Sequence, residues 1–266
     1  MTKKILITGG NGYIGSNLSR YLAKEYDLTL LNRSIVDLTD SNTLSDWFEN
    51  KFFDVIIHTA IKGGSRLQKD QPSIIDYNIS IYNNLLRCKD HYNRFINLGS
   101  GAEIYDLLSP YGLSKRAIYE SLQDKDNYFS LRIFGIFDHN ELNSRFIKTS
   151  LYRYIHKKNI ILFQNKLMDF IYFTDFAKII NFYITNTNPP KNLDCVYKNK
   201  ISLYDIADII IHLDDYNVDI EILEDIMFND YIGVFTELNL DFDGLNTGII
   251  NTYKEMIKYE KNMVCP

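Results

Sequence analysis

The sequence feature that most constrains the fold is a glycine-rich loop, TGGNGYIG, at residues 8–15 of a 266-residue chain. The loop follows an apolar run of strand length, KKILI, and precedes a helix-like stretch, YIGSNLSRYLAKEY. In this position Gly9 permits a tight turn, Gly12 permits close approach of a pyrophosphate, and Gly15 permits tight helix–strand packing. The N–H groups at the helix start would face an anion. The loop therefore predicts dinucleotide binding rather than an ordinary turn.

The rest of the first half alternates between strand-like and helix-like segments. Strands are expected at residues 28–32, 54–60, 94–100 and 128–137, with helices at 72–91 and 111–122. This alternation predicts an α/β fold with a Rossmann-type, doubly wound parallel sheet.

After about residue 140 the alternation becomes less regular. We expect helices at residues 144–158, 202–213 and 247–261, and strands at 159–163 and 194–199. These predict a core domain (1–140) and a smaller C-terminal substrate-binding lobe (141–266), with about 159–200 returning to the core. The segment NTNPPKN, residues 186–192, is the clearest candidate for a linker.

The composition excludes several classes of protein. With 45% hydrophobic residues and 5 prolines the chain can bury a core, and a net charge of -5 argues against nucleic-acid binding. Its three cysteines, Cys88, Cys195 and Cys265, are far apart and odd in number, which indicates free thiols rather than disulfides or a metal site. No apolar run is long enough for a membrane span or a signal-peptide core. We therefore expect a cytoplasmic protein without a metal or a membrane partner.

A tyrosine and a lysine lie four residues apart in YGLSK, as Tyr111 and Lys115. On a helix this spacing puts both side chains on one face, but in a chain with 20 tyrosines it is also expected by chance. The spacing by itself therefore does not indicate catalysis.

The motifs together resemble the short-chain dehydrogenase/reductase superfamily, which has TGxxGxxG in its first loop and a catalytic YxxxK pair. Ser100, at the end of the expected strand RFINLGS, lies where that family has a serine or threonine. The resemblance implies that Tyr111 is the proton donor, Lys115 its electrostatic partner, and Ser100 the residue that holds the substrate carbonyl.

Further stretches resemble the extended, nucleotide-sugar branch of this superfamily, and most closely its GDP-fucose synthase group. KLMDFIYFTDFAKII contains Asp169, Phe170 and Asp175 of an R-D-F-x-x-V-x-D segment, and NLGSGAEIY resembles L-G-S-S-C-I-Y. Where that group has an acid-base cysteine and histidine for epimerisation, this chain has Gly101 or Ala102, and Arg145.

Two other polar residues near the predicted site are expected to be inactive. Dehydratases of the branch carry an Asp–Glu pair in the strand-end loop, but this chain has Ala102 and Glu103, and we expect Glu103 to be a solvated loop residue. His58 follows a strand, and we expect it to be packed or to line the cofactor site rather than to act as a base.

The end of the second strand sets the choice of cofactor. An acidic residue there would bind the ribose of NAD, but the sequence is LLNRS, and an arginine suits the 2′-phosphate of NADPH, so we expect NADPH rather than NADH. The resemblance implies the following cofactor-binding residues: Gly9, Asn11, Gly12, Tyr13, Ile14, Asn32, Arg33, Ser34, Asp37, Leu38, Thr59, Ala60, Lys62 and Lys115.

The substrate would contact Ser100 and Tyr111 and, in the C-terminal lobe, Arg145, Phe163 and Asp169. The resemblance implies an NADPH-dependent oxidoreductase that reduces the C4 keto group of a nucleoside-diphosphate 4-keto-6-deoxy sugar or heptose, for capsule, lipopolysaccharide or other surface glycan. Two alternatives remain open: an epimerase or epimerase-reductase, and a non-catalytic NADP(H)-binding regulator. By analogy with the fold, the helices around residues 74–86 and 112–122 would form a homodimer contact.

Overall fold

The computed structural model describes residues 2–65, 67–224 and 229–264, which divide into two compact units. The first unit comprises Met1–Ile133 and Ile180–Leu193, and the second comprises Phe134–Ile179 and Asp194–Pro266. The segment that returns to the first unit, Ile180–Leu193, is shorter than the segment 159–200 expected from the sequence.

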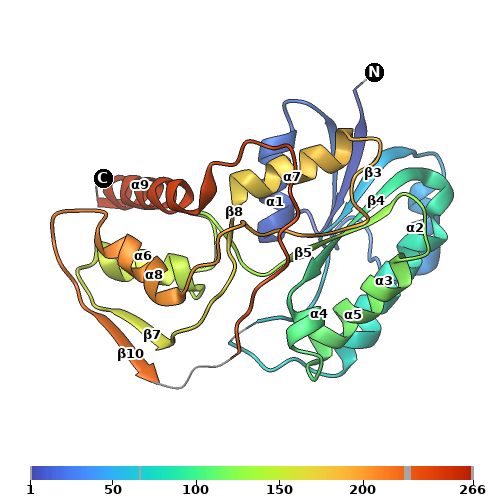
Figure 1. Ribbon diagram of the computed structural model, residues 1–266. Helices are drawn as coiled ribbons and strands as arrows, with labels where there is room; N and C mark the ends of the chain where they lie inside the picture. Colours follow the sequence, from blue (N-terminus) through green and yellow to red (C-terminus); the bar gives the residue numbers. More distant parts are fainter. Residues whose placement is uncertain (1, 66, 225–228, 265–266) are drawn as a thin grey trace. The chain divides into compact units, whose positions relative to one another are not determined.

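The first unit is built on a six-stranded sheet with strand order β2-β1-β3-β4-β5-β9, and the pairs from β2 to β5 are parallel. Helix α1 lies on one face of the sheet and α2, α3 and α5 lie on the other (Figure 1). The elements in chain order are β1 (Lys4–Thr8), α1 (Tyr13–Leu22), β2 (Asp27–Leu31), α2 (Ser41–Phe48), β3 (Phe53–His58), α3 (Ser73–Arg87), the 3₁₀ turn η1 (Lys89–His91), β4 (Tyr92–Ser100), α4 (Ala102–Tyr105), α5 (Pro110–Leu122) and β5 (Tyr128–Ile133). This is the doubly wound α/β arrangement that the sequence predicts.

Covering the sheet on both faces explains the apolar sequences of its central strands. Ile5, Leu6 and Ile7 of β1 are fully buried, although their side chains point alternately to the two faces. Leu6 belongs to a core cluster with Phe48 of α2 and Leu85 of α3. The strand order reverses between β1 and β3, and a doubly wound sheet binds its ligand at such a switch point.

The proline-containing segment 186–192 is not a linker between the two units, in contrast to the sequence prediction. It connects α7 (Phe173–Thr185) to β9 (Asn192–Asp194) and packs against the first unit. The guanidinium group of Arg94 donates to the backbone oxygens of Tyr183 and, at 2.8 Å, Asn186. The Tyr183 hydroxyl donates to the Pro190 carbonyl at 2.8 Å. The prolines therefore mark a fixed turn back to the sheet edge.

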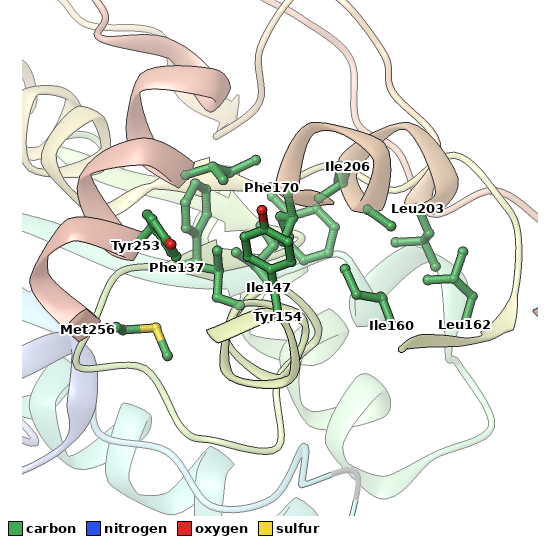
Figure 2. Packing of buried hydrophobic residues seen from close by; sticks show 14 of the residues in the cluster. Phe137, Ile147, Tyr154, Ile160, Leu162, Phe170, Leu203, Ile206, Tyr253 and Met256 are labelled. Carbon is green, nitrogen blue, oxygen red and sulfur yellow. The ribbon is translucent and has the colours of Figure 1, made fainter. Parts of the chain in front are cut away.

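The second unit has its own hydrophobic core between helices and two small sheets. Strand β7 pairs with β10 and β6 with β8, and both pairs are parallel. The core contains Ile147, Tyr154, Phe170, Ile206 and Tyr253, whose side chains converge from several segments of this unit (Figure 2). Its elements are β6 (Ile136–Phe137), α6 (Phe146–Ile155), β7 (Ile160–Gln164), β8 (Ile171–Tyr172), the first half of α7, α8 (Leu203–Ile211), β10 (Ile220–Glu224) and α9 (Gly244–Val264).

Cys88 and Cys195 are buried and form no disulfide, and Cys265 lies outside the described residues. Among the helices in the described part of the chain, none has both the length and the apolar character needed to span a bilayer.

Candidate functional site

A cavity of about 340 Å³ lies in the first unit at the switch point of the sheet. Its walls come from the loops that follow β1, β2 and β3, and from one side of α3. The lining residues are Gly9, Asn11, Gly12, Leu31, Asn32, Arg33, Ser34, Val36, Asp37, Leu38, Thr59, Ala60, Ile61, Tyr77 and Ile81.

The glycine loop at one end of this cavity requires glycine for steric reasons. Gly9 has a φ of 69°, and a Cβ atom there would lie 2.8 Å from the backbone nitrogen of Ala60. The Gly12 N–H donates to the Gly9 carbonyl at 2.9 Å, which closes the turn before α1. No side chain caps the start of α1. The loop thus fits the pyrophosphate of a dinucleotide.

Charged and aromatic groups gather at the end of the cavity beyond β2. The Arg33 guanidinium lies 3.4 Å from an Asp37 carboxylate oxygen and 5.6 Å from the centroid of the Tyr77 ring. The Lys62 ammonium lies over the same ring at 4.2 Å. The Asn32 side chain donates to Asn11 at 3.3 Å. Two cations therefore lie close to one tyrosine ring at this cavity.

Most of the residues predicted to bind the cofactor line this cavity, whereas Tyr13 and Ile14 begin α1, Lys62 lies over Tyr77, and Lys115 is on α5. Sequence reasoning missed the residues Leu31, Val36, Ile61, Tyr77 and Ile81. Tyr77 carried no motif, because its place at the cavity depends on how α3 packs beside the loops.

Tyr111 and Lys115 lie together on α5, as their spacing on a helix requires. The helix begins after Ser109, whose hydroxyl accepts from the Gly112 N–H at 3.0 Å, and Pro110 occupies its first position. The Lys115 ammonium is 5.7 Å from the centroid of the Tyr111 ring and donates to the Leu98 carbonyl at 2.5 Å. The lysine is only 5% exposed, and this burial lowers its pKa to about 8.

Ser100 ends β4, the strand whose Leu98 carbonyl is bound by Lys115. Its hydroxyl accepts from the Ala102 N–H at 3.2 Å. Parallel strands place their carboxyl ends at one edge of a sheet, so Ser100 and the loops after β1 and β3 share that edge. The structure therefore brings the predicted catalytic residues and the dinucleotide cavity together within one unit.

His58 is packed inside the first unit, as we expected. Its Nδ1 is 2.9 Å from the Thr8 hydroxyl, and its ring lies against Phe95 with centroids 5.7 Å apart. Burial, with a smaller effect of the Lys115 charge, lowers the pKa of His58 to about 3. The imidazole is therefore neutral at physiological pH and is a weak proton acceptor.

The expectation that Glu103 is a solvated loop residue is wrong. Its side chain is fully buried, and one carboxylate oxygen lies 2.6 Å from the Arg132 guanidinium nitrogen Nε. The other oxygen accepts from the Ser100 N–H at 3.3 Å. Burial raises the pKa of Glu103 above its ordinary value, and the Arg132 guanidinium offsets only part of this effect. A short helix, α4, turns this residue inward, and one residue's identity in the sequence could not indicate that direction.

The predicted substrate residues of the second unit lie on separate elements. Arg145 precedes α6, and Phe163 lies on β7 with 60% of its surface exposed. Asp169 is buried, and its carboxylate accepts from Lys200 at 2.6 Å and from the Gly233 N–H at 2.7 Å. Because protein groups bind this carboxylate, the contacts favour a structural role for Asp169 over direct contact with the substrate.

The second unit also contains a cavity of about 510 Å³, formed by residues 197–201, 209 and 243–246. None of Arg145, Phe163 and Asp169 lines it, although Lys200, the partner of Asp169, does. Ser100, Tyr111 and Lys115 belong to the first unit, as does the smaller cavity, so we place the candidate site there.

The sequence profile of the family described as NAD dependent epimerase/dehydratase matches residues 5–195. Curated protein sequences gave no match.

Solved structures similar to this chain include enzymes with different activities. A GDP-L-fucose synthetase from Naegleria fowleri bound to NADP is 16% identical, with a TM-score of 0.77, covering 97% of this chain and 94% of that one. A UDP-N-acetylglucosamine 4-epimerase from Methanobrevibacter ruminantium is 17% identical (TM-score 0.81; 97% and 99% covered). A GDP-mannoheptose C4 reductase from Campylobacter jejuni with NADP bound is 15% identical (TM-score 0.74; 97% and 98% covered). At these identities the likeness is one of fold.

Proposed function

Because the chain belongs to the NAD-dependent epimerase/dehydratase family, in the extended nucleotide-sugar branch of the short-chain dehydrogenases/reductases, we propose that it is an enzyme that acts on nucleotide sugars with a nicotinamide dinucleotide. More specifically, we propose an NADPH-dependent reductase for the C4 keto group of a nucleoside-diphosphate 4-keto-6-deoxy sugar or heptose. The observation that carries this proposal is the approach of the buried Lys115 ammonium to the Tyr111 ring, in the unit that holds the dinucleotide cavity.

When bound, the cofactor supplies the hydride, which goes to the carbonyl carbon. The Tyr111 hydroxyl donates its proton to the carbonyl oxygen, so that the ketone becomes an alcohol. An unperturbed tyrosine has a pKa of about 10, and the Lys115 cation stabilises the phenolate that remains. The Ser100 hydroxyl donates a hydrogen bond to the same carbonyl oxygen and orients it.

The residues that follow β4 favour reduction over epimerisation or dehydration. Gly101 and Ala102 offer no acid-base side chain, and both oxygens of the Glu103 carboxylate are engaged by Arg132 and Ser100. Removing a proton beside the ketone requires a positioned base, and these residues of the loop do not supply one. Hydride transfer with proton donation by Tyr111 requires none.

The cavity beyond β2 favours NADPH over NADH. No carboxylate directly follows β2, whereas the exposed Arg33 guanidinium and Lys62 lie beside the cavity. An arginine can bind a 2′-phosphate through two parallel hydrogen bonds.

We further propose that the enzyme acts in the cytoplasm and that its product is a precursor of capsule, lipopolysaccharide or another surface glycan. The proposed enzyme is a homodimer that pairs helices α3 and α5 of each subunit.

The test is NADPH oxidation, followed at 340 nm, against GDP-, CDP-, dTDP- and UDP-linked 4-keto sugars. We expect turnover with one class of substrate, and a decrease in kcat/KM of at least about 100-fold in Tyr111→Phe. Tyr105→Phe, at an exposed tyrosine of the same region, should leave turnover unchanged. Solvent deuterium entering carbons beside the ketone would instead indicate an epimerase. Tight NADPH binding without turnover on the whole panel would indicate a regulator.

A further inference from the structure

A buried ion pair lies directly behind the end of β4. Glu103 has no exposed side-chain surface, Arg132 is 12% exposed, and Nε of Arg132 is 2.6 Å from Oε1 of Glu103. Removing two charges from water costs several kcal/mol per ion, and such pairs seldom stabilise a fold more than an apolar pair would. A role other than stability would explain the presence of this pair.

The pair is bound to the residues that form the site. Oε2 of Glu103 accepts from the Ser100 N–H at 3.3 Å. A Cβ atom on Gly99 would lie 2.9 Å from the same oxygen, so the carboxylate occupies the space that glycine leaves open. Arg132 pairs with Gly99 across β4 and β5, and its guanidinium lies 5.1 Å from the centroid of the Tyr119 ring on α5. The ion pair therefore contacts both the strand of Ser100 and the helix of Tyr111.

A second interaction holds the same end of the strand. Lys115 donates to the Leu98 carbonyl at 2.5 Å, two residues before the Ser100 N–H that Glu103 binds. Leu98 and Ser100 are thus tied to two oppositely charged groups, one on α5 and one on α4. A shift of this strand end would therefore move Ser100 and the carbonyl group that Lys115 binds together.

Glu103 is also the acidic group that acts on the charge of Lys115. Among the described residues, Glu103 is the carboxylate whose attraction raises the pKa of Lys115 against the larger effect of burial. From β3, His58 faces the lysine as a neutral imidazole, because its pKa lies at about 3. From α5 itself, Tyr111 presents its ring, and from β5, Arg132 is paired with Glu103.

We propose that Glu103, held by Arg132, is a positioning residue of the reductase site: it fixes Ser100 at the strand end and places a negative charge beside the strand that Lys115 binds. This inference rests on the proposed function for its effect on turnover. Loss of the Glu103 charge should lower the pKa of Lys115, so that less of the ammonium form is present to stabilise the Tyr111 phenolate.

The decisive variant is Glu103→Gln, which keeps an oxygen acceptor for the Ser100 N–H but removes the charge. Lys115 should titrate at a lower pH in this variant, by about one unit, as expected for the loss of one nearby opposite charge. The titration is measured by NMR of ¹³C-lysine-labelled protein, with the Lys115 signal assigned by its absence in Lys115→Met. The alkaline limit of kcat/KM should move to lower pH by a similar amount.

Two further variants keep the result interpretable. Glu103→Gln/Arg132→Met removes both charges, so that no unpaired guanidinium remains buried, and it should also lower the Lys115 titration. Glu120→Gln removes an exposed carboxylate of α5 that pairs with Arg116, and it should change neither measurement.

An unchanged Lys115 titration in both Glu103 variants would overturn the inference. The NMR titration needs no turnover, so it decides this question even if no 4-keto sugar is reduced. A wild-type enzyme that reduces the sugar, with a pH limit unaffected by Glu103→Gln, would contradict the inference and leave the proposed function intact.

Discussion

Burial determines what individual titratable residues do in this protein. Glu103, Lys115 and His58 all lie in the first unit with almost no exposed surface, whereas the side chain of Arg33 is 62% exposed. Burial disfavours the charged form of each group, and only a suitable partner offsets this effect. Glu103 has Arg132 as its partner, while His58 contacts the neutral Thr8 and Phe95 and is opposed by the Lys115 charge.

The buried neutral His58 should make folding sensitive to acid. Because its pKa falls to about 3 in the folded state, the unfolded chain takes up the proton first as the pH falls below about 6.5. This contribution to stability is therefore complete above pH 6.5 and is lost progressively toward pH 3. Between pH 7 and pH 5 the loss is about 2 kcal/mol.

Urea unfolding of wild type and His58→Asn at pH 7 and pH 5 tests this prediction. The variant should lose about 2 kcal/mol less between the two pH values, because other titrating groups affect both proteins equally. Identical pH dependence in the two proteins would contradict it.

Arg33 should determine the preference between the two cofactors. Arg33→Gln removes a charge-assisted contact to a 2′-phosphate, so we expect the Kd for NADPH to rise about 10-fold or more and the Kd for NADH to change less than about 2-fold. Fluorescence titration with both cofactors measures this, with Arg116→Gln on α5 as the control. An equal loss for both cofactors would mean that Arg33 does not contact the phosphate.

At the scale of secondary-structure elements, short polar contacts decide how the functional segments begin. Helix α5 starts after the Ser109 cap, and this start puts Tyr111 in its first turn and Lys115 one turn later. In the second unit, α9 begins beside α7 because the buried Asp175 accepts from the N–H groups of Asp243 and Gly244 at 2.8 and 2.9 Å. Tyr197 and Lys178 also donate to this carboxylate.

Asp175→Ala should destabilise the protein strongly. The substitution leaves the Tyr197 hydroxyl and two backbone N–H groups without their acceptor, which should cost about 3 kcal/mol or more in free energy of unfolding. Urea unfolding measures the change. Asp208→Ala, which removes a half-exposed carboxylate of α8, should change stability by less than about 0.5 kcal/mol. Similar losses in both variants would exclude a special role for Asp175.

At the scale of the whole molecule, the chain crosses between two hydrophobic cores three times, at residues 133, 179 and 193. The first unit is therefore not contiguous in sequence. Residues 180–193 supply Ile180, Tyr183, Ile184 and Leu193 to its buried surface. The backbone N–H of Ser130 in β5 donates to the Lys191 carbonyl at 3.1 Å.

A fragment of residues 1–133 should consequently fail to fold, even though it contains every predicted cofactor-binding and catalytic residue. Without residues 180–193 the edge of β5 and apolar surface beneath it are exposed, and such an edge favours aggregation. Circular dichroism, size-exclusion chromatography and NADPH titration test the fragment beside the full chain. A monomeric fragment that unfolds cooperatively and binds NADPH would contradict this prediction.

The sequence by itself determined the parallel α/β sheet, the glycine loop and the proximity of Tyr111 and Lys115. These features depend on local rules: periodic apolar residues, a left-handed turn that requires Gly9, and one turn of helix between two side chains. The glycine loop and the Tyr111–Lys115 pair are local in sequence, and the sheet follows from a simple alternation of such local segments. The family profile over residues 5–195 agrees with this part of the prediction.

Only the tertiary structure decided the direction of Glu103, the place of Tyr77 beside the cavity, and the return of residues 180–193 to the first sheet. Each depends on partners distant in sequence: Arg132 lies 29 residues after Glu103, and Lys191 lies 61 residues after Ser130. Whether a carboxylate is solvated or buried depends on the free energy of such contacts, and local sequence does not encode their geometry.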